Sequence, residues 1–149
     1  MAKKKTPEEI AEENARTNEV GLFNSADSYL LCARQLINNR PAHLRFDDPI
    51  HFLLFHAAEL YLKSYLRQKG ENVAALKDLG HYHARICEKT VTFGLKLSSE
   101  VRDIFELIDQ NDAVIESRYI VTGFKKPIDN QKLVAVVEEV RAKVKTSHS

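Results

Sequence analysis

The chain has 149 residues, of which 29% are charged and 44% hydrophobic, and its formal net charge at pH 7 is +1. This length and composition are typical of one globular domain that buries its own core without disulfides or a structural metal. Because 22 Lys and Arg residues oppose 21 Asp and Glu residues, the overall charge does not favour a nucleic-acid partner, and any such binding must come from a local patch.

Cys32 and Cys87 lie inside helical patterns and have no partner at metal-binding or redox spacing, which is typical of free thiols in a reducing cytoplasm. The lysines at positions 3–5 resemble the start of a signal peptide, but the polar sequence TPEEIAEEN follows them. No run of about 18 apolar residues occurs anywhere. We therefore expect a cytoplasmic protein that is neither exported nor inserted in a membrane.

A first helix is expected to begin after Thr6, which forms a capping-box pattern with Glu9 while Pro7 occupies the first helical position. This helix carries little apolar surface. We therefore assign residues 1–20 to a polar N-terminal arm and residues 21–146 to a helical bundle. Gly21 is the expected joint between the two.

Apolar residues recur at spacings of three and four from Leu22 to Ile37, which predicts an amphipathic helix that ends near Asn38. The loop from residue 40 to 48 then leads into the stretch from Pro49 to Gly70. Nearly every position between 50 and 62 is apolar, so we expect this central helix to be surrounded by its neighbours.

The central helix has recognisable end signals. Asp47 or Asp48 can cap its start, and Gly70 can adopt the left-handed conformation that ends it. One polar stripe interrupts its apolar surface, with members spaced three, four and four residues apart. The stripe consists of His56, Glu59, Lys63 and Arg67.

This polar stripe is the first candidate for chemistry. Glu59 precedes Lys63 by four residues, the favourable order for a helical ion pair, and burial would make that pair more consequential. In the simplest alternative, Lys63 and Arg67 are solvated and His56 is a hydrogen-bonded core histidine.

After Gly70 we expect a short helix, a break at Gly80, and a longer helix that Gly94 closes. One apolar side of this region is formed by Leu79, Tyr82, Ile86 and Phe93.

Ser98 is expected to cap the next helix. Its inward positions are Val101, Ile104, Phe105, Ile108 and Ile115, and its outward positions are Asp103, Glu106, Asp109 and Asp112. The helical period is then lost until Asp129 or Asn130, either of which can cap a last helix. That helix turns Leu133, Val136, Val137, Val140 and Val144 inward, and residues 145–149 are expected to form a frayed tail.

No run of alternating residues predicts a sheet, and no segment repeats at a fixed period. The expected fold is therefore all-α, an antiparallel bundle of four or five helices joined by short loops.

Three segments resemble a known family in their order and spacing. They are HAAELYLKSYLRQKG on the central helix, GHYHARI about ten residues later, and ESRY before the last helix. Together they resemble the HEPN domains of prokaryotes over roughly residues 23–144. The matching positions are Ala57, Ala58, Glu59, Lys63 and Gly70 in the first segment, Gly80 and His81 in the second, and Arg118 and Tyr119 in the third.

The resemblance implies a bundle of four or five helices, homodimers, and work on RNA or nucleotides. Members of the family occur in toxin and antiphage defence systems, often beside nucleotidyltransferase partners. Some members are non-catalytic binding modules.

Active HEPN ribonucleases are similar in carrying an Arg, a polar residue and then a His after four to six intervening residues. No metal is needed there, because His moves a proton and Arg stabilises the charge that develops on phosphate. Arg102 and Asp103 could begin such a motif, but no His follows at that spacing. Two other pairs match the spacing, as chance alone allows: Arg45 with His51, and Arg141 with His148. We therefore assign no catalytic residue.

Other chemistry is disfavoured. His81 and His83 could suggest a metal site with His56 and Glu59, but residues two apart on a helix diverge, and a capping or hydrogen-bonding role for His81 is favoured. No phosphate-binding glycine loop and no readable pair of nucleophile and base occur. No metal or cofactor is expected.

The most basic stretch after the arm contains Arg118 and Tyr119, followed by Lys125, Lys126 and Lys132. Arg118 could bind phosphate while Tyr119 stacks on a base. In the alternative, Tyr119 covers the core, Arg118 pairs with Glu116 or a helix end, and the lysines are solvated.

Our leading hypothesis is a dimeric, non-catalytic module that binds RNA or a nucleotide, or that docks on a partner protein such as a nucleotidyltransferase. Its candidate groove is formed by His56, Glu59, Lys63, His81, Arg118 and Tyr119. The first alternative is a metal-independent endoribonuclease of the toxin type. The second is a structural interaction module in which the polar stripe only fixes helix packing.

Overall fold

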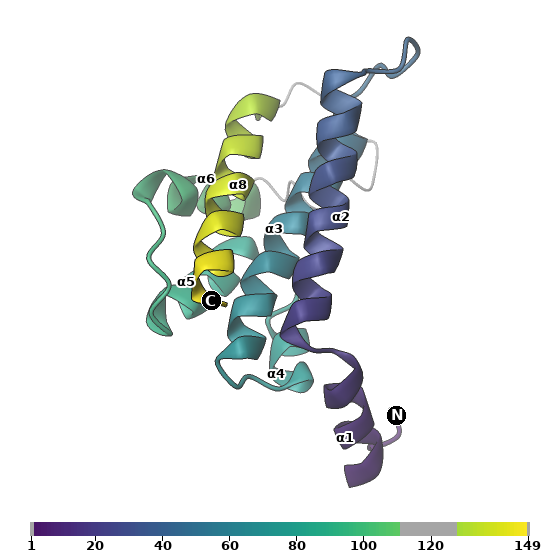
Figure 1. Ribbon diagram of the computed structural model, residues 1–149, viewed down its shortest axis with the longest axis vertical. Coiled ribbons are helices and arrows are strands. Elements are labelled where there is room, and N and C mark those ends of the chain that lie inside the picture. The colour runs from purple at the N-terminus through teal and green to yellow at the C-terminus, as the bar shows by residue number, and fades with distance from the viewer. Residues whose placement is uncertain (1, 111–127, 149) are drawn as a thin grey trace.

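The computed structural model describes residues 2–110 and 128–148 (Figure 1). The helices in these ranges are α1 (Pro7–Arg16), α2 (Glu19–Asn38), α3 (Asp48–Gln68), α4 (Val73–Asp78), α5 (His83–Thr92), α6 (Ser99–Gln110) and α8 (Asn130–Ser147). These ranges contain no strand. The all-α bundle predicted from the sequence is therefore confirmed.

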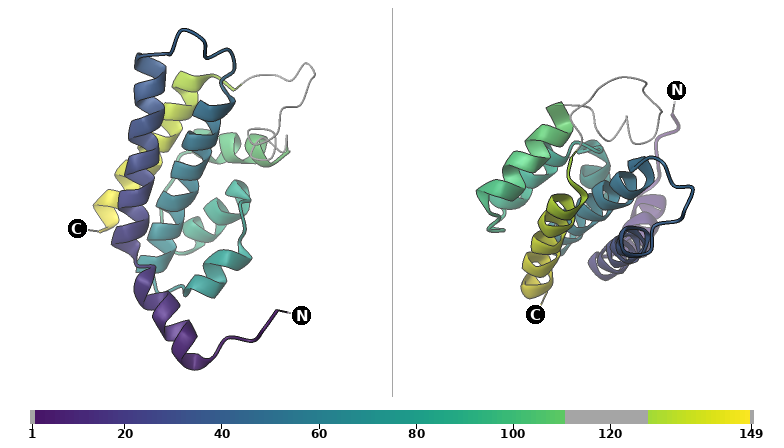
Figure 2. Two further views of the ribbon diagram at one scale, coloured as in Figure 1. Left: turned by 90° about the vertical axis from the view of Figure 1, so that its right-hand side faces the viewer. Right: turned by 90° about the horizontal axis from the view of Figure 1, so that it is seen from above.

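Helix α3 lies at the centre of the bundle, with α2 and α8 packed along it and α5 and α6 on another side (Figures 1 and 2). One buried cluster joins these helices. It includes Leu30 of α2, Leu62 of α3, Ile86 of α5, Phe105 of α6 and Val140 of α8. The expectation that neighbours surround the central helix is confirmed.

Helices α2 and α3 form an antiparallel hairpin, whereas α3 and α8 run in the same direction (Figure 2). At their first turns, His51 Nε2 lies 2.7 Å from Asn130 Oδ1. At their last turns, Gln68 Nε2 donates to the carbonyl of Ser147 at 2.6 Å. Paired contacts at both ends thus set the register between α3 and α8.

Helix α1 forms the arm, and its predicted capping box between Thr6 and Glu9 is present. None of its residues is buried. The prediction that Gly21 is the joint is wrong, because the chain turns at residues 17 and 18, where Asn18 caps α2 by accepting from the amide of Gly21. Gly21 therefore belongs to the first turn of α2. The division into residues 1–20 and 21–146 stays a prediction.

The predicted ends of α3 are correct within one or two residues. Gly70 adopts the left-handed conformation at φ 102°, as expected for a glycine that ends a helix. Asp47 occupies the capping position but makes no side-chain capping bond. Its carboxylate instead accepts from Arg40 Nη1 at 2.5 Å.

Tyr82 and Phe93 are not part of the core, contrary to the prediction, since they are 61% and 39% exposed. Helix α5 begins only at His83 and ends at Thr92. Both aromatic residues occupy the capping positions just outside it, so a helical period extended across them assigns their side chains to the wrong side.

The prediction that Asp109 faces solvent is wrong. Its carboxylate accepts from the amide of His83 at 3.0 Å and from the amide of Ala84 at 2.8 Å. It therefore caps α5 from α6, a role that the period of its own helix cannot reveal. The predicted positions Asp112 and Ile115 lie outside the described residues.

The expected frayed tail is also wrong for the residues described. Helix α8 continues to Ser147, and His148 Nε2 lies 3.1 Å from Ser64 Oγ. The His148 ring packs edge-on against Phe23, with ring centroids 5.7 Å apart. These contacts stabilise the last turn of α8.

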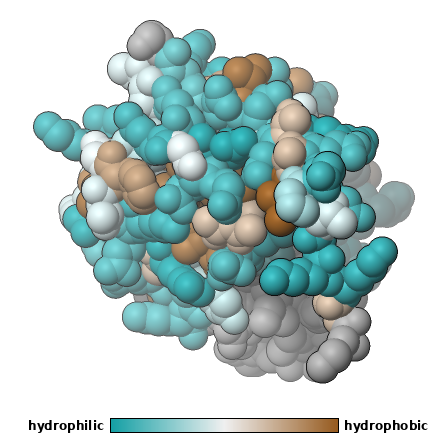
Figure 3. Space-filling view, turned by 90° about the horizontal axis from the view of Figure 1, so that it is seen from below, coloured by the Kyte–Doolittle hydropathy of each residue, from teal (hydrophilic) through white to brown (hydrophobic). Residues whose placement is uncertain are grey.

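Seen from below, the molecule is mostly hydrophilic, and hydrophobic residues reach the surface only in separate patches (Figure 3). Among residues 2–110 and 128–148, no helix is long and apolar enough to cross a membrane.

Candidate functional site

Glu59 is a buried acidic residue on α3, and its side chain is only 4% exposed. Its carboxylate contacts His81 in the turn that precedes α5. Lys63 Nζ donates to its Oε1 at 2.7 Å, and His81 Nδ1 lies 2.9 and 3.0 Å from its two oxygens. His56 Nδ1 lies 3.8 Å from Oε2. We call these four residues the Glu59 network.

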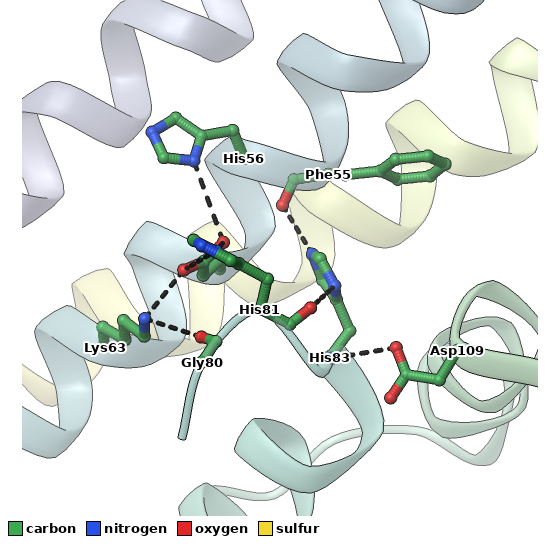
Figure 4. A network of polar contacts seen from close by, with 8 residues as sticks. Phe55, His56, Lys63, Gly80, His81, His83 and Asp109 are labelled. Carbon is green, nitrogen blue, oxygen red and sulfur yellow. Dashed lines mark hydrogen bonds and ion pairs between the residues drawn. The ribbon is translucent and has the colours of Figure 1, made fainter. Parts of the chain in front are cut away.

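The helical period explains why the network forms. His56, Glu59 and Lys63 are three and four residues apart on α3, so they share one face. His81 comes from the chain that returns past this face after α4 (Figure 4). The structure thus brings together four of the six predicted site residues. The other two, Arg118 and Tyr119, lie outside the described residues.

The carboxyl group of Glu59 is ionised despite its burial. Burial alone raises its pKa, but the contacts with His56 and Lys63, the charge of Lys63 and the hydrogen bond from His81 more than offset this effect and lower the pKa to about 2. A buried carboxylate of this kind is stable only while its partners remain in place.

Lys63 is not solvated, contrary to the simplest interpretation, because its side chain is only 12% exposed. Besides its bond to Glu59, Nζ donates to the carbonyl of Gly80 at 2.9 Å. Gly80 has φ 61°, a left-handed conformation that favours glycine. Lys63 therefore connects α3 to the turn that carries His81.

His81 is the most exposed member of the Glu59 network, with 55% of its side chain accessible to solvent. A carboxylate only accepts hydrogen bonds, so Nδ1 of His81 must carry the proton that faces Glu59. In the neutral ring this leaves Nε2 as an acceptor, and no described residue bonds to it. His81 thus has a fixed orientation and one available ring nitrogen.

His56 is not the hydrogen-bonded core histidine that the simplest interpretation expects. Its Nδ1 is buried without a hydrogen-bond partner among the described residues. Its ring packs against Tyr29, with centroids 4.4 Å apart, and is nearly parallel to the Phe52 ring at 6.0 Å. Aromatic packing rather than hydrogen bonding therefore holds His56.

His83 has a supporting role that sequence reasoning, which considered it only as a metal ligand, did not predict. It is completely buried, with Nε2 2.6 Å from the carbonyl of Phe55 and Nδ1 3.1 Å from the carbonyl of His81. Burial lowers the pKa of His83, so the neutral ring donates one N–H, which we assign to the shorter contact. The sequence signal that could have indicated this role is that His83 follows His81 by two residues at the start of a helix.

A comparison with family models assigns the chain. The model described as HEPN domain matches residues 21–147, which is most of the sequence. The chain belongs to the HEPN domain family. No curated protein and no solved structure matches it.

Membership of the HEPN family is in general associated with nucleotides and RNA. The structure describes two of the three segments that suggested the family. Glu59 and Lys63 of the first segment form one bonded network with His81 of the second. Arg118 and Tyr119 of the third segment lie outside the described residues.

The fourth stripe residue, Arg67, takes no part in this network of the HEPN domain. Its guanidinium donates to the carbonyls of Asn14, Thr17 and Glu71 at 3.1, 3.0 and 3.2 Å. It is therefore partly buried rather than solvated, and it connects the end of α3 to the end of the arm.

The HEPN nuclease spacing is met by two pairs that lie in different surroundings. His51 binds Asn130, and Arg45 is exposed in the loop before α3. Arg141 donates to both oxygens of Asp27 at 2.7 and 3.2 Å. Arg141 Cζ and the His148 ring lie 5.6 and 5.7 Å from the ring centroid of Phe23. Among the described residues, Arg141 and His148 thus both contact Phe23, whereas no such shared contact joins Arg45 and His51.

No group of three or more His, Cys, Asp or Glu within the described ranges is arranged to hold a metal ion. A hollow of about 340 Å³ lies on the arm and includes no member of the Glu59 network. It is lined by Lys5, Glu9, Glu12, Glu13, Arg16 and Thr17.

Proposed function

We propose that this HEPN domain is a non-catalytic module that binds RNA or a nucleotide, with His81 as the group that contacts the ligand. The observation that carries the proposal is the geometry of His81. Glu59 holds its Nδ1, the side chain is 55% exposed, and no described residue bonds to Nε2. A protonated His81 ring would donate Nε2–H to a phosphate oxygen without changing its orientation.

Glu59 and Lys63 have a supporting role in this proposal. Each is nearly buried and bonded within the protein, so they orient His81 and do not contact the ligand. His56 lies beside the same carboxylate and contributes an aromatic surface. Arg118 and Tyr119 are proposed as a phosphate and a base contact of the same site.

The proposal includes the absence of RNA cleavage. The support for this point is that the Arg141 and His148 side chains each contact another residue of the protein. Arg141 donates to Asp27, and His148 contacts Ser64. A nuclease would need both side chains directed at the same phosphate group.

Purified protein incubated with labelled RNA in EDTA tests this function. We expect retention of intact RNA that weakens as salt rises, because phosphate contacts release counterions. His81→Ala should weaken binding about tenfold, the effect of losing one charge-assisted hydrogen bond. Lys96→Ala removes an exposed lysine outside the network and should have no such effect. Binding that ignores His81→Ala, or that ignores salt, contradicts the proposal.

A metal-independent endoribonuclease is the second candidate, and the meeting of Arg141 and His148 at Phe23 favours it. In the same assay this activity would appear as RNA cleavage in EDTA. His148→Ala and Arg141→Ala would each abolish it. The measurement is the length of the RNA products on a denaturing gel.

The structural alternative, in which the stripe only fixes helix packing, has its own test. Lys63→Met would leave Glu59 buried without its lysine, so we expect a marked loss of stability. If RNA is not bound and this variant only destabilises the protein, the Glu59 network serves packing alone.

We further propose that the domain is a cytoplasmic homodimer that works in a toxin or antiphage system beside a partner such as a nucleotidyltransferase. Family membership supports these points. Light scattering of the purified protein tests the dimer, and co-purification with the product of a neighbouring gene tests the partner.

A further inference from the structure

The loop of residues 39–47, between α2 and α3, is held in shape by its own bonds. Arg40 Nε donates to the carbonyl of Leu44 at 3.1 Å, and Arg40 Nη1 donates to Asp47 at 2.5 Å. The Leu44 side chain packs against the buried core. The loop therefore has a defined structure anchored to the bundle.

This anchored loop presents Arg45 and Phe46 to solvent. Phe46 is 62% exposed, and the neighbouring Arg45 is also exposed. No hydrogen bond or ion pair of the Arg45 side chain occurs among the described residues. An exposed ring beside an exposed guanidinium is the combination that stacks on a base and binds a phosphate in single-stranded nucleic acid.

The loop leads directly into the helix that carries the Glu59 network. Asp48 and Glu59 are eleven residues apart on α3, which corresponds to about 16 Å along its axis. Between them lie Phe52 and His56, whose rings are nearly parallel at 8° with centroids 6.0 Å apart. The aromatic rings of Phe52 and His56 therefore lie on α3 between the loop and the Glu59 network.

We propose that loop 39–47 is a second contact for the ligand and that this ligand is a single-stranded nucleic acid several nucleotides long rather than a mononucleotide. Arg45 binds a phosphate and Phe46 stacks on a base, while His81 binds a second phosphate. This inference rests on the proposed function. The part of α3 between the loop and Glu59 is about 16 Å long, which equals about five nucleotide steps at a rise of ~3.4 Å each. We therefore expect that one mononucleotide does not span both contacts.

Fluorescence anisotropy with the full chain and a fluorescein-labelled 12-nucleotide oligouridylate tests the inference. We expect Phe46→Ala and Arg45→Gln each to weaken binding about five- to tenfold. Arg45→Gln should also lower the slope of log Kd against log salt by about 0.7. Binding of uridine monophosphate, measured by calorimetry, should be the same for both variants and the unsubstituted protein.

Two control variants are matched to these substitutions. Leu31→Ala truncates a side chain that is 67% exposed on α2, and Arg102→Gln removes an exposed arginine on α6. Neither should change oligonucleotide binding. An oligodeoxythymidylate of the same length shows whether the sugar matters, and the loop substitutions should weaken binding of whichever strand is bound.

The outcomes separate this inference from the proposed function. If His81→Ala weakens oligonucleotide binding while Phe46→Ala and Arg45→Gln do not, the second contact is overturned and the proposed function stands. Equal weakening by Leu31→Ala and Phe46→Ala also overturns the second contact. If the unsubstituted protein binds neither the oligonucleotide nor the monophosphate, both proposals fail.

Discussion

At the scale of single residues, Glu59 depends on its neighbours more than any other side chain of the network. Burial raises its pKa, and three neighbours reverse that effect to about 2. Two of these neighbours are in turn oriented by Glu59, because His81 and Lys63 both direct a donor at it. The orientation of His81 is therefore a property of the whole network.

The same pKa predicts how stability changes with pH. The folded pKa of about 2 lies below the ordinary value of 4.5, so the contribution of Glu59 is complete above pH 4.5 and is lost as the pH falls toward 2. We expect Glu59→Gln to lower the free energy of unfolding by about 3 kcal/mol at pH 7. That difference should shrink at acid pH, as measured by urea unfolding from pH 7 to pH 3.

Glu106→Gln is the control for this measurement, because Glu106 is exposed on α6 and should change stability little. A difference between Glu59→Gln and the unsubstituted protein that stays constant across this pH range would contradict the ionised state of Glu59.

At the scale of elements, the start of α5 depends on a side chain from α6. Asp109 accepts from two backbone amides of α5, and α5 makes no capping bond with its own N-cap residue. We expect Asp109→Ala to lower the free energy of unfolding by about 1 kcal/mol. Asp103→Ala, an exposed site on the same helix, should have little effect in the same urea titration.

Helix α1 has no buried residue, so polar bonds at its C-terminal end hold it in place. Arg67 supplies two of them, to Asn14 and Thr17. We expect Arg67→Met to increase hydrogen exchange and proteolysis in residues 7–16 while the bundle stays protected. Arg85→Met, at an exposed position on α5, is the control. Unchanged exchange in α1 would show that other contacts position the arm.

At the scale of the whole molecule, α3 unites the bundle because α2, α5 and α8 all pack against it. Leu62 lies fully buried in the shared core, whereas Leu31 is 67% exposed. We expect Leu62→Ala to lower the free energy of unfolding by about 3 kcal/mol, because it leaves a cavity among several helices. Leu31→Ala should stay within about 0.5 kcal/mol. Equal losses in denaturant unfolding would contradict this assignment of the core.

The sequence was a good guide wherever a signal lies within one element. The capping box at Thr6, the apolar period of α2 and α8, and the glycine stop at Gly70 are all local, and the structure confirms them. Prediction was poor at Tyr82 and Phe93, because a short helix leaves its capping residues outside the helical period.

The candidate site was only partly predictable for a related reason. The spacing of His56, Glu59 and Lys63 shows that they share a face, but it cannot show that the face is buried. The simplest interpretation of the sequence left Lys63 and Arg67 solvated, whereas Lys63 binds the carbonyl of Gly80 and Arg67 binds the arm. The roles of Asp109 and His83 depend on partners that are 25 to 28 residues away along the chain.

By itself, the sequence determined the all-α class, most helix ends and the family, because periodicity, caps and motif order are local or linear properties of a chain. Only the tertiary structure decided which polar groups are buried and what they bind. The reason is physical: the charge of Glu59 and the orientation of the His81 ring depend on distances between α3 and a turn that the sequence separates by about 20 residues.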